Sequence, residues 1–348
     1  MSKGYATLKD VAKLAGTTAA TVSYVLNGSE ERYISPEMKK RVLDAAKQLN
    51  YVKSSVASSL KGKKRKMIAV LVPQFSNQFF TRMILEIEKV ADEFDYILSI
   101  CNTFDDPERE QEILERMAQH RVDGYIIAAT TKGAENTARI RNLGIPLVAL
   151  DRPLEGESQD NYIWVTTSNY SCGYLGAQHL AQKGHSKIAF VGWDSHINDL
   201  LIREQGFVDA LHQQGLVAEQ ALIVRGEFSE QDGYRLTKEL LTQYPDISAI
   251  FYGYNIQARG GVQYLTEQGI EIGNDISVIL IGSPEWAVSG QNNFTHILQH
   301  EYEMGQTAAK ILFDMINGKD KGAPRSIVQE CSLYEGNSVK SILNKKQK

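Results

Sequence analysis

Apolar side chains in the first fifty residues recur at the spacing of short helices. One stripe at positions i, i+3, i+4 and i+7 is formed by Leu8, Val11, Ala12 and Ala15. Thr7 and Asp10 have the form of a capping box, which satisfies free backbone N–H groups at a helix start. Gly16 can adopt the left-handed conformation that ends a helix. The pattern therefore predicts a short helix between Thr7 and Gly16.

A second helix is predicted over residues 19–26, with Thr18 as its N-cap. Its inward positions hold Val22, Val25 and Leu26. Its outer positions hold small or polar side chains, namely Ala19, Ala20, Ser23 and Tyr24. Ser35 and Pro36 then open a third amphipathic helix. Two helices around a glycine turn, supported by a third, are typical of a helix-turn-helix, whose second helix enters the DNA major groove.

From Met67 the pattern changes to short apolar runs that alternate with amphipathic helices. The predicted strands are 67–73, 96–102, 124–129, 187–192, 222–226, 248–253 and 277–282. The predicted helices include 80–94, 108–120, 203–214 and 232–243. Continuous apolar strands are buried on both faces, which predicts parallel α/β sheets. Because the scheme repeats from Ser186, we expect two doubly wound halves with a ligand crevice at the carboxyl ends of their strands.

Charge is divided unevenly along the chain of 348 residues. Residues 1–66 carry 14 basic and 5 acidic side chains, a balance of +9, and residues 67–348 carry −13. A solvated lysine-rich surface is the plain alternative for such a basic segment. Here the positive charge coincides with the helix-turn-helix pattern. It therefore indicates a nucleic-acid-binding module joined to a body that does not bind DNA.

Patterns for a metal site, a cofactor or a catalytic centre are missing from the sequence. Cys101, Cys172 and Cys331 stand alone in apolar settings, which predicts buried thiols and neither a disulfide nor a metal site. The histidines are not paired at metal-ligand spacing, and the P-loop, GxSxG, HExxH and glycine-rich dinucleotide motifs are absent. We expect no catalytic residues, no metal and no cofactor, and a protein that is not an enzyme.

The location of the protein is predicted from two further features. A signal-peptide pattern is not visible, and the longest apolar runs are shorter than the ~20 residues that a membrane span needs. We therefore expect a cytoplasmic, nucleoid-associated protein.

Two long segments resemble the LacI/GalR family of bacterial transcription regulators. They read DVAKLAGTTAATVSYVLNG and LNYVKSSVASSLKGKKRKMIAVLVPQFSNQFF. The resemblance continues in the same order through CNTFDDPEREQ, RVDGYIIAAT, IPLVALDRPL, HLAQKGHSKIAFVG, REQGF and ISVILIG, to about Tyr334. It thus covers nearly the whole chain and rests on several specific motifs.

The resemblance implies a fold with two parts. One is a small all-α helix-turn-helix DNA-binding domain, and the other is an α/β core like the periplasmic binding proteins, with two doubly wound parallel-sheet subdomains. The implied boundaries are a DNA-binding domain over 1–53, a hinge helix and basic linker over 54–66, a core over 67–340 and a tail over 341–348. Within the core, the N-subdomain takes 67–162 and 292–322, and the C-subdomain takes 163–291 and 323–340.

The resemblance also implies which residues contact operator DNA. In the helix-turn-helix these are Thr7, Thr18, Ala19, Ala20, Thr21, Ser23, Tyr24 and Asn27, and in the hinge Ser54, Ser55, Val56, Ala57 and Leu60. Tyr24 stands where the family usually has an arginine suited to guanine, so it can contact a base, a phosphate or a thymine methyl group. Leu60 keeps the leucine that wedges into the minor groove and bends the duplex. Helix-turn-helix geometry further predicts a homodimer on a pseudo-palindromic operator.

The resemblance places an effector in the crevice of the core. The implied contacts are Asn77, Phe79, Phe80, Thr130, Arg203, Tyr254, Glu285, Trp286 and Gln299. Arg203 matches an arginine that grips ligand hydroxyls or carboxylates, and the alternative for it is a salt bridge at a helix start. Tyr254-Asn255 and the segment 283–286 replace acidic pairs, and Ser168 replaces an aspartate. The effector is thus left open among a larger sugar, a phosphorylated or non-sugar compound, or none.

These features together predict an effector-responsive repressor of carbohydrate-utilisation genes. One alternative is a global or constitutive regulator whose core binds a protein partner or no ligand. An alternative from another class is a sugar-acting enzyme or a sugar-binding transport protein. The missing acid–base pair argues against the enzyme, and the DNA-binding pattern argues against the transport protein.

Overall fold

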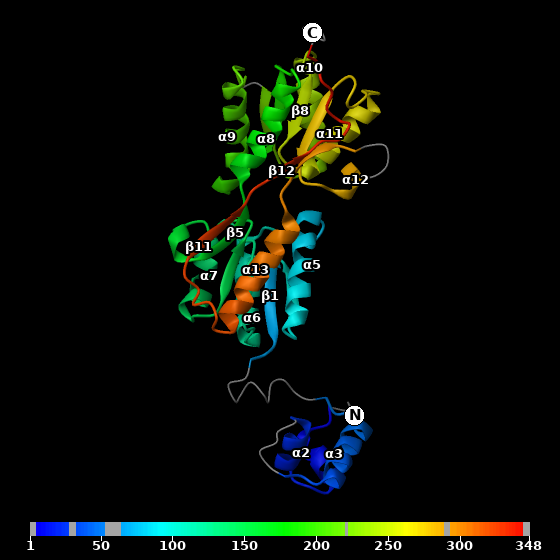
Figure 1. Cartoon of the computed structure of the whole chain (residues 1–348), viewed down its shortest axis with the longest axis vertical. Helices are drawn as coiled ribbons and strands as arrows, with labels where there is room; N and C mark the ends of the chain where they lie inside the picture. The colour runs from blue at the N-terminus through cyan, green and yellow to red at the C-terminus, as the bar shows by residue number, and fades with distance from the viewer. Residues whose placement is uncertain (1–4, 28–32, 53–63, 220–221, 289–292, 344–348) are drawn as a thin grey trace. The chain divides into compact units, whose positions relative to one another are not determined.

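The computed structural model describes residues 5–27, 33–52, 64–219, 222–288 and 293–343. The chain divides into two compact units, residues 1–65 and 66–348, and each is described here by itself. Figure 1 labels their helices and strands.

The N-terminal unit contains the three predicted helices, α1 (Leu8–Ala15), α2 (Ala19–Leu26) and α3 (Pro36–Gln48). The capping box is present, because Thr7 Oγ1 accepts from Asp10 N at 3.3 Å and Asp10 Oδ2 accepts from Thr7 N at 2.8 Å. Gly16 ends α1 with a φ of 65°. Arg41 of α3 donates to the carbonyl oxygen of Ala15 at 2.6 Å and so supports this turn. The buried side chains at the centre are Val11, Ala12, Ala15, Val22, Val42 and Ala45.

The core unit has two lobes, each built on a six-stranded sheet. The sheet of the first lobe has the order β11-β5-β4-β3-β1-β2, and every adjacent pair in it is parallel. Its strands are β1 (Met67–Val72), β2 (Ile97–Asn102), β3 (Tyr125–Ile127), β4 (Leu147–Leu150), β5 (Ile163–Thr167) and β11 (Arg325–Gln329). Its helices are α5 (Gln78–Glu93), α6 (Pro107–His120), α7 (Gly133–Asn142) and α13 (Glu301–Ile316), with a short 3-10 turn over Gln159–Asn161.

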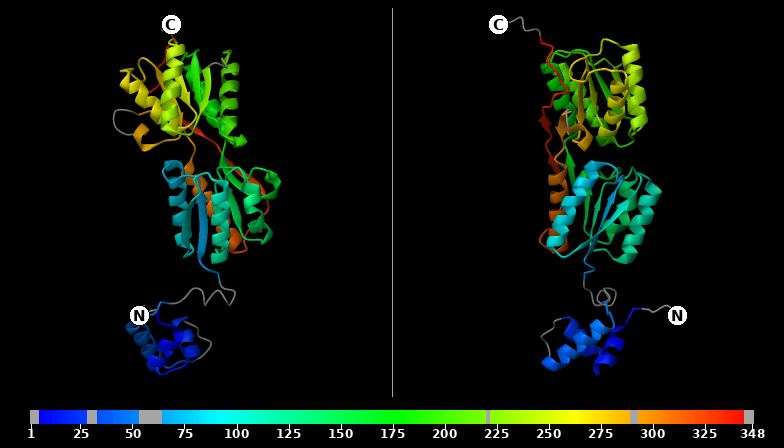
Figure 2. Two further views of the ribbon diagram at one scale, coloured as in Figure 1. Left: turned by 180° about the vertical axis from the view of Figure 1, so that it is seen from behind. Right: turned by 90° about the vertical axis from the view of Figure 1, so that its right-hand side faces the viewer.

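The second lobe has the sheet order β12-β10-β9-β8-β6-β7, with β12 antiparallel to β10. Its strands are β6 (Ile188–Trp193), β7 (Ile223–Gly226), β8 (Ala249–Tyr252), β9 (Ser277–Ile281), β10 (Thr295–Leu298) and β12 (Ser332–Tyr334). Its helices are α8 (Asn169–Gln182), α9 (Asn198–Gln213), α10 (Glu230–Gln243), α11 (Asn255–Glu267) and α12 (Glu285–Val288). In both lobes one hydrophobic cluster fills each face of the sheet, which explains the continuous apolar strands. Figure 2 shows the helical layers on either side of the sheets.

The chain passes between the lobes three times. It crosses from β5 to α8 after Thr167, from β10 to α13 after Leu298, and from β11 to β12 after Gln329. The sequence analysis placed these crossings near 162, 291 and 323, which is several residues early in each case. For the first and third crossings the reason is that β5 and β11 pair along Arg325↔Ile163 to Gln329↔Thr167 within the first lobe before either strand leaves it. The second crossing comes later because β10 pairs with β9 and β12 in the second lobe as far as Leu298.

One prediction about the cysteines is wrong. Cys172 of α8 and Cys331, between β11 and β12, form a disulfide with Cα atoms 5.8 Å apart. Their sequence separation of 159 hides this proximity, because only the crossing of β11 into the second lobe brings Cys331 to α8. Cys101 is a free cysteine with a partly exposed side chain. Within the described ranges, no helix is long and apolar enough to span a membrane.

Candidate DNA-reading face and ligand cleft

Helix α2 presents a face of small and polar side chains. Only Val22 of this helix is fully buried, whereas Ala20 is exposed and Tyr24 is partly exposed. Thr18 fixes the helix start, because its Oγ1 accepts from Thr21 N at 3.2 Å. Asn27 closes the other end by donating to the Ser23 carbonyl oxygen at 2.7 Å. Spacing by four and three residues places Ala20, Tyr24 and Asn27 on one side of the helix.

The remaining predicted DNA contacts divide into two groups. Thr7 is exposed at the start of α1. Ala19, Thr21 and Ser23 are partly exposed on α2. Ser54, Ser55, Val56, Ala57 and Leu60 lie outside the described residues.

A cleft of about 330 Å³ lies between the two lobes of the core. It is lined by Pro73, Gln74, Asn77, Phe79, Phe80, Asp105, Asp151, Arg152, Trp193, Leu200, Arg203, Glu227, Phe228, Ser229, Tyr254, Asn255, Ile281 and Gln299. Most of these residues follow the carboxyl end of a strand, where parallel sheets place their ligands.

Six of the nine predicted effector contacts line the cleft, namely Asn77, Phe79, Phe80, Arg203, Tyr254 and Gln299. The other three do not. Thr130 is buried and donates through its backbone N and its hydroxyl to Glu110, at 2.7 and 3.0 Å. Glu285 and Trp286 line a second hollow, which shares Asn77 and Asn255 with the cleft. The Trp286 ring packs on Phe294, with the ring centroids 5.7 Å apart, and lies against the hydrophobic cluster of the second lobe.

Three aromatic rings meet at one wall of the cleft. The ring centroids of Trp193 and Phe228 are 5.0 Å apart, and each lies 5.7 Å from the centroid of Tyr254. Tyr254 is also fixed by its hydroxyl, which donates to the Leu200 carbonyl oxygen at 3.1 Å. The contacts hold the rings in place, and rings of this kind can pack against the C–H face of a ligand.

Arg203 is held rigidly beside this wall. Its Nε donates to Asn169 Oδ1 at 2.7 Å and its Nη1 donates to the Gly253 carbonyl oxygen at 2.9 Å. The guanidinium carbon lies 4.6 Å from the centroid of the Tyr254 ring. Arg203 lies inside α9, which begins five residues earlier than predicted, so a salt bridge at a helix start is not its role. The cleft is lined in part by the Arg203 side chain, which these contacts hold in position.

The cleft contains three acidic groups that the sequence analysis did not name, at positions other than those where family acids are replaced. Asp105 follows β2, Asp151 follows β4 and Glu227 follows β7. The Asp105 carboxylate pairs with Arg152 Nη1 at 2.5 Å, and the Arg152 guanidinium lies 5.7 Å from the Trp193 ring. The sequence analysis missed these residues because it named only those cleft positions that the family resemblance implied. Inspecting the residues after every predicted strand would have found them.

Gln299 is a buried donor that faces the cleft without a partner. Its side chain lines the cleft and the residue is 5% exposed. Nε2 has no hydrogen-bond partner among the described residues. An unpaired buried amide is costly unless something binds it. A ligand oxygen in the cleft would satisfy this group.

A helix-turn-helix unit and a two-lobed core with a polar and aromatic cleft define a DNA-binding regulator controlled by a ligand. Comparison with known proteins agrees. Residues 7–54 match the family model "Bacterial regulatory proteins, lacI family". Residues 65–336 match "Periplasmic binding proteins and sugar binding domain of LacI family". The chain therefore belongs to the LacI family and is an effector-regulated, DNA-binding transcriptional repressor.

Individual relatives extend over nearly the whole chain. The HTH-type transcriptional repressor PurR of Haemophilus influenzae (strain PittEE) is 32% identical, covering 97% of this chain and 100% of the relative. A LacI-family regulator structure from Silicibacter pomeroyi has a TM-score of 0.80 at 26% identity, covering 96% of this chain and 99% of that one. The structure of a CelR–cellobiose complex has a TM-score of 0.71 at 25% identity, with coverages of 96% and 99%. Both structures are thus similar in fold to this chain.

Proposed function

We propose that the protein is a repressor of carbohydrate-utilisation genes whose operator affinity is switched by a sugar or sugar derivative in the cleft. The observation that carries this proposal is the aromatic wall of Trp193, Phe228 and Tyr254 beside charged groups. A sugar offers apolar C–H faces and many hydroxyls. The rings suit the faces, while Asp105, Asp151 and the Gln299 amide suit the hydroxyls. The similar CelR structure was solved with cellobiose.

The charged groups of the cleft favour a neutral ligand over a strongly charged one. Arg152 is already paired with Asp105, and Arg203 is engaged by Asn169 and a carbonyl oxygen. A phosphate would have to compete with the Asp105 carboxylate for Arg152, and with Asn169 and the carbonyl oxygen for Arg203. A neutral ligand with many hydroxyls can instead accept from Arg203 and donate to the carboxylates. Thr130 bonds Glu110 and is left out of the proposed contacts. Glu285 and Trp286 line a hollow that shares Asn77 and Asn255 with the cleft, and they stay proposed contacts at its edge.

The DNA partner is proposed to be a pseudo-palindromic operator. Its contacts are proposed to come from Thr7, from the exposed face of α2 and from the hinge residues. The +9 balance of residues 1–66 supports this, since basic side chains neutralise backbone phosphates. The protein would act in the cytoplasm as a regulator and not as an enzyme, as its curated relatives are transcriptional repressors.

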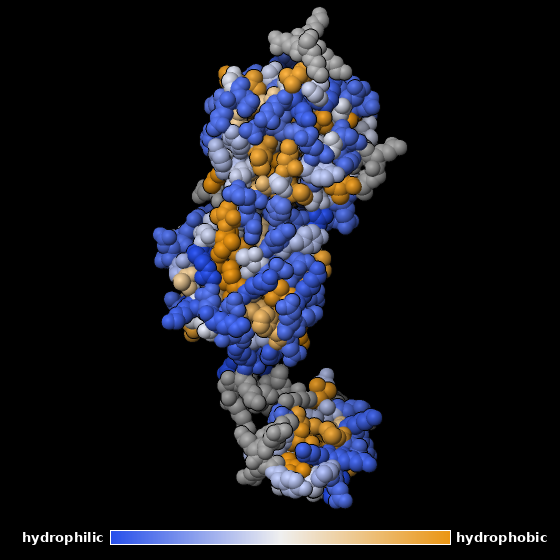
Figure 3. All heavy atoms as spheres, in the orientation of Figure 1, coloured by the Kyte–Doolittle hydropathy of each residue, from blue (hydrophilic) through white to orange (hydrophobic). Residues whose placement is uncertain are grey.

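The protein is proposed to act as a homodimer, because two heads are needed for two half-sites. In support, β2 is the edge strand of its sheet and has no buried residue, although Ile97 and Ile100 are apolar. Figure 3 shows hydrophobic patches that interrupt the hydrophilic surface of the core.

Ile97→Glu should lower the mass measured by light scattering from that of a dimer to that of a monomer. Val217→Glu, at an equally exposed apolar position of the second lobe, should leave the dimer intact.

The ligand proposal is tested by calorimetry with a panel of neutral mono- and disaccharides, including cellobiose. At least one should bind the full-length protein and change its affinity for an operator duplex selected from a random pool. Phe228→Ala should weaken that sugar at least tenfold. Tyr234→Ala removes a ring that packs on Tyr264 away from the cleft and should not. Operator binding without any sugar response would instead favour a core that binds a protein or no ligand.

A further inference from the structure

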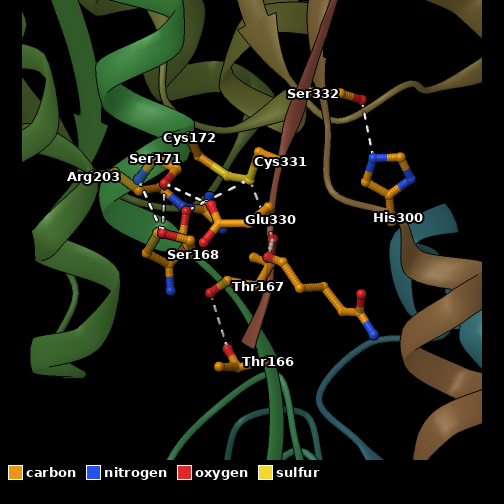
Figure 4. Close-up of a disulfide and its surroundings, with 12 residues drawn as sticks. Thr166, Thr167, Ser168, Ser171, Cys172, Arg203, His300, Glu330, Cys331 and Ser332 are labelled. Atoms are coloured by element: carbon orange, nitrogen blue, oxygen red, sulfur yellow. Dashed lines mark hydrogen bonds between the residues drawn. A yellow bond between two sulfur atoms is a disulfide. The ribbon is translucent and has the colours of Figure 1, made fainter. Parts of the chain in front are cut away.

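The Cys172–Cys331 disulfide lies where the three crossings between the lobes meet. Thr167 Oγ1 and Ser168 N, on the first crossing, both donate to the Gln329 carbonyl oxygen on the third, at 3.3 and 2.9 Å. A hydrogen bond of 2.9 Å joins His300 Nε2, on the second crossing, to Ser332 Oγ on the third. Figure 4 shows the disulfide beside these contacts. Among the described residues, the disulfide is the one covalent cross-link at this junction.

Contacts connect this disulfide to the ligand cleft. On α8, Asn169 lies one helical turn before Cys172 and accepts from Arg203 Nε at 2.7 Å. The next residue after Cys172 is Gly173, where a Cβ atom would lie 1.8 Å from the Arg203 carbonyl oxygen. Helices α8 and α9 therefore touch through their backbones beside the cysteine. On the second crossing, Gln299 of the cleft directly precedes His300.

We propose that the Cys172–Cys331 pair is a redox-sensitive lock on the hinge of the core. The disulfide ties the third crossing to α8 and holds the lobes in the arrangement described here. Reduction releases that crossing, so the lobes can move further and the residues that position Arg203 and Gln299 lose a constraint. Intracellular disulfides more often serve redox sensing or catalysis than structure. The catalytic case does not apply to a repressor core.

The two sulfur atoms differ in access, which sets the route of the chemistry. Cys172 is completely buried, whereas Cys331 is partly exposed and lines a surface groove with Tyr170, Tyr174 and Glu330. The thiolate of a dithiol reductant attacks Cys331 Sγ, the S–S bond breaks, and Cys172 leaves as a thiolate that takes up a proton. The second thiol of the reductant then attacks the reductant sulfur that is bonded to Cys331 in the mixed disulfide, and Cys331 is released as a thiolate. Two electrons pass from the dithiol, which becomes a cyclic disulfide, and the reverse reaction oxidises the protein.

The test compares the oxidised and reduced full-length protein. After equilibration with oxidised dithiothreitol, alkylation and mass spectrometry should find one free thiol, Cys101, and after reduced dithiothreitol they should find three. Affinity for an operator duplex selected by the reduced protein should differ at least threefold between the two forms. Amide hydrogen exchange over residues 329–332 and 299–301 should be slower in the oxidised form.

Three variants separate the lock from other effects of redox reagents. Cys331→Ser should behave like the reduced wild type in either buffer, and Cys172→Ala serves as a second variant in case the serine perturbs folding. Cys101→Ser should keep the full redox difference. Three alkylated thiols in the oxidising buffer, or equal operator affinity and equal hydrogen exchange in the two forms, would overturn the proposal. None of these readouts requires a sugar, so failure of the carbohydrate proposal leaves this test valid.

Discussion

Arg82 of the first lobe holds Ser283 of the second lobe through two hydrogen bonds. Its Nη1 donates to Ser283 Oγ at 2.7 Å and its Nη2 donates to the Ser283 carbonyl oxygen at 2.8 Å. Arg82 Nη1 also pairs with Glu301 Oε1 at 2.6 Å, and Glu301 is only 4% exposed. Nearby, Gln78 Oε1 accepts from Glu285 N at 2.9 Å. These contacts link lobe closure to a buried ion pair within the first lobe.

The ion pair gives a first prediction about stability. Arg82→Ala should lower the unfolding free energy of the core by about 3 kcal/mol, because it leaves the Glu301 carboxylate buried without its cation. Adding Glu301→Gln should recover about half of this loss, since the neutral amide does not need a counter-charge. Trp164, Trp193 and Trp286 all lie in the core, so urea unfolding followed by tryptophan fluorescence reports on this unit alone.

Ser283→Ala is the matched control for the Arg82→Ala and Glu301→Gln variants. It removes the hydroxyl on the second lobe but keeps the pair of Arg82 with Glu301, so it should cost less than about 1 kcal/mol. A double variant that is as unstable as the sum of its single changes would show that the carboxylate is not stabilised by Arg82.

Gln299 gives a second prediction, in which stability and ligand affinity change in opposite directions. Gln299→Met keeps a similar volume but removes the unpaired buried donor. The ligand-free core should therefore become more stable, by about 1 kcal/mol. Affinity for the sugar found in the binding screen should fall by about 1–3 kcal/mol, because the amide no longer reaches a ligand oxygen. Calorimetry and fluorescence-detected unfolding measure the two effects, and unchanged affinity would remove Gln299 from the site.

Tyr24 gives a third prediction, on DNA reading. If the ring reads a base edge, Tyr24→Ala should weaken operator binding by about 1–3 kcal/mol and relax the preference at one position in each half-site. Selection from random DNA pools with both proteins checks this. Tyr33→Ala is the control, because Tyr33 is a tyrosine of the same unit that is 92% exposed and lies outside α2. The same base preference with and without the Tyr24 ring would assign it to the phosphate backbone.

His185 gives a fourth prediction, on pH. Burial lowers the pKa of His185 below its ordinary value of 6.5, although a hydrogen bond with the Lys340 carbonyl oxygen opposes this, and the charges of Lys340 and His179 lower it further. Burial likewise lowers the pKa values of His179 and His296. Protonation is therefore easier in the unfolded chain. The stability that these neutral histidines provide is present above pH 6.5 and is lost as the pH falls below it.

Urea unfolding at pH 7.5 and pH 5.5 measures this dependence. The wild type should be less stable at the lower pH, and His185→Asn should lose less stability between the two values. His120→Asn changes an exposed histidine on α6 and should leave the pH dependence as it is in the wild type. An equal loss in the wild type and in His185→Asn would exclude His185 as a source.

Local pattern predicted the elements of this protein well. The capping box at Thr7 and Asp10, the left-handed Gly16 and the three N-terminal helices are all confirmed. The core strands and helices for which bounds were predicted appear within a few residues of them, apart from the earlier start of α9. Bounds were not predicted for β4, β5, β10, β11 and β12. Helix caps depend on neighbours within about one helical turn, and buried strands depend on a continuous apolar run. Both signals can be read from consecutive residues of the sequence.

Tertiary structure decided where the elements meet. The sequence identified Arg203 and Tyr254 as cleft residues by resemblance, but only the fold shows that Asn169 and a carbonyl oxygen already occupy two donors of Arg203. The fold also shows that Thr130 donates to a buried glutamate and that Trp286 packs on Phe294. A side chain's partner depends on packing across the sheet, which spacing along the chain does not encode.

The cysteines show the same division. The sequence by itself determined a DNA-binding head, an α/β core of two halves and three cysteines without a local motif. It could not pair Cys172 with Cys331, because their contact requires β11 to lie beside β5 and then enter the second lobe next to α8. Local periodicity fixes which residues are buried, whereas the order of the strands in a sheet fixes which buried residues touch.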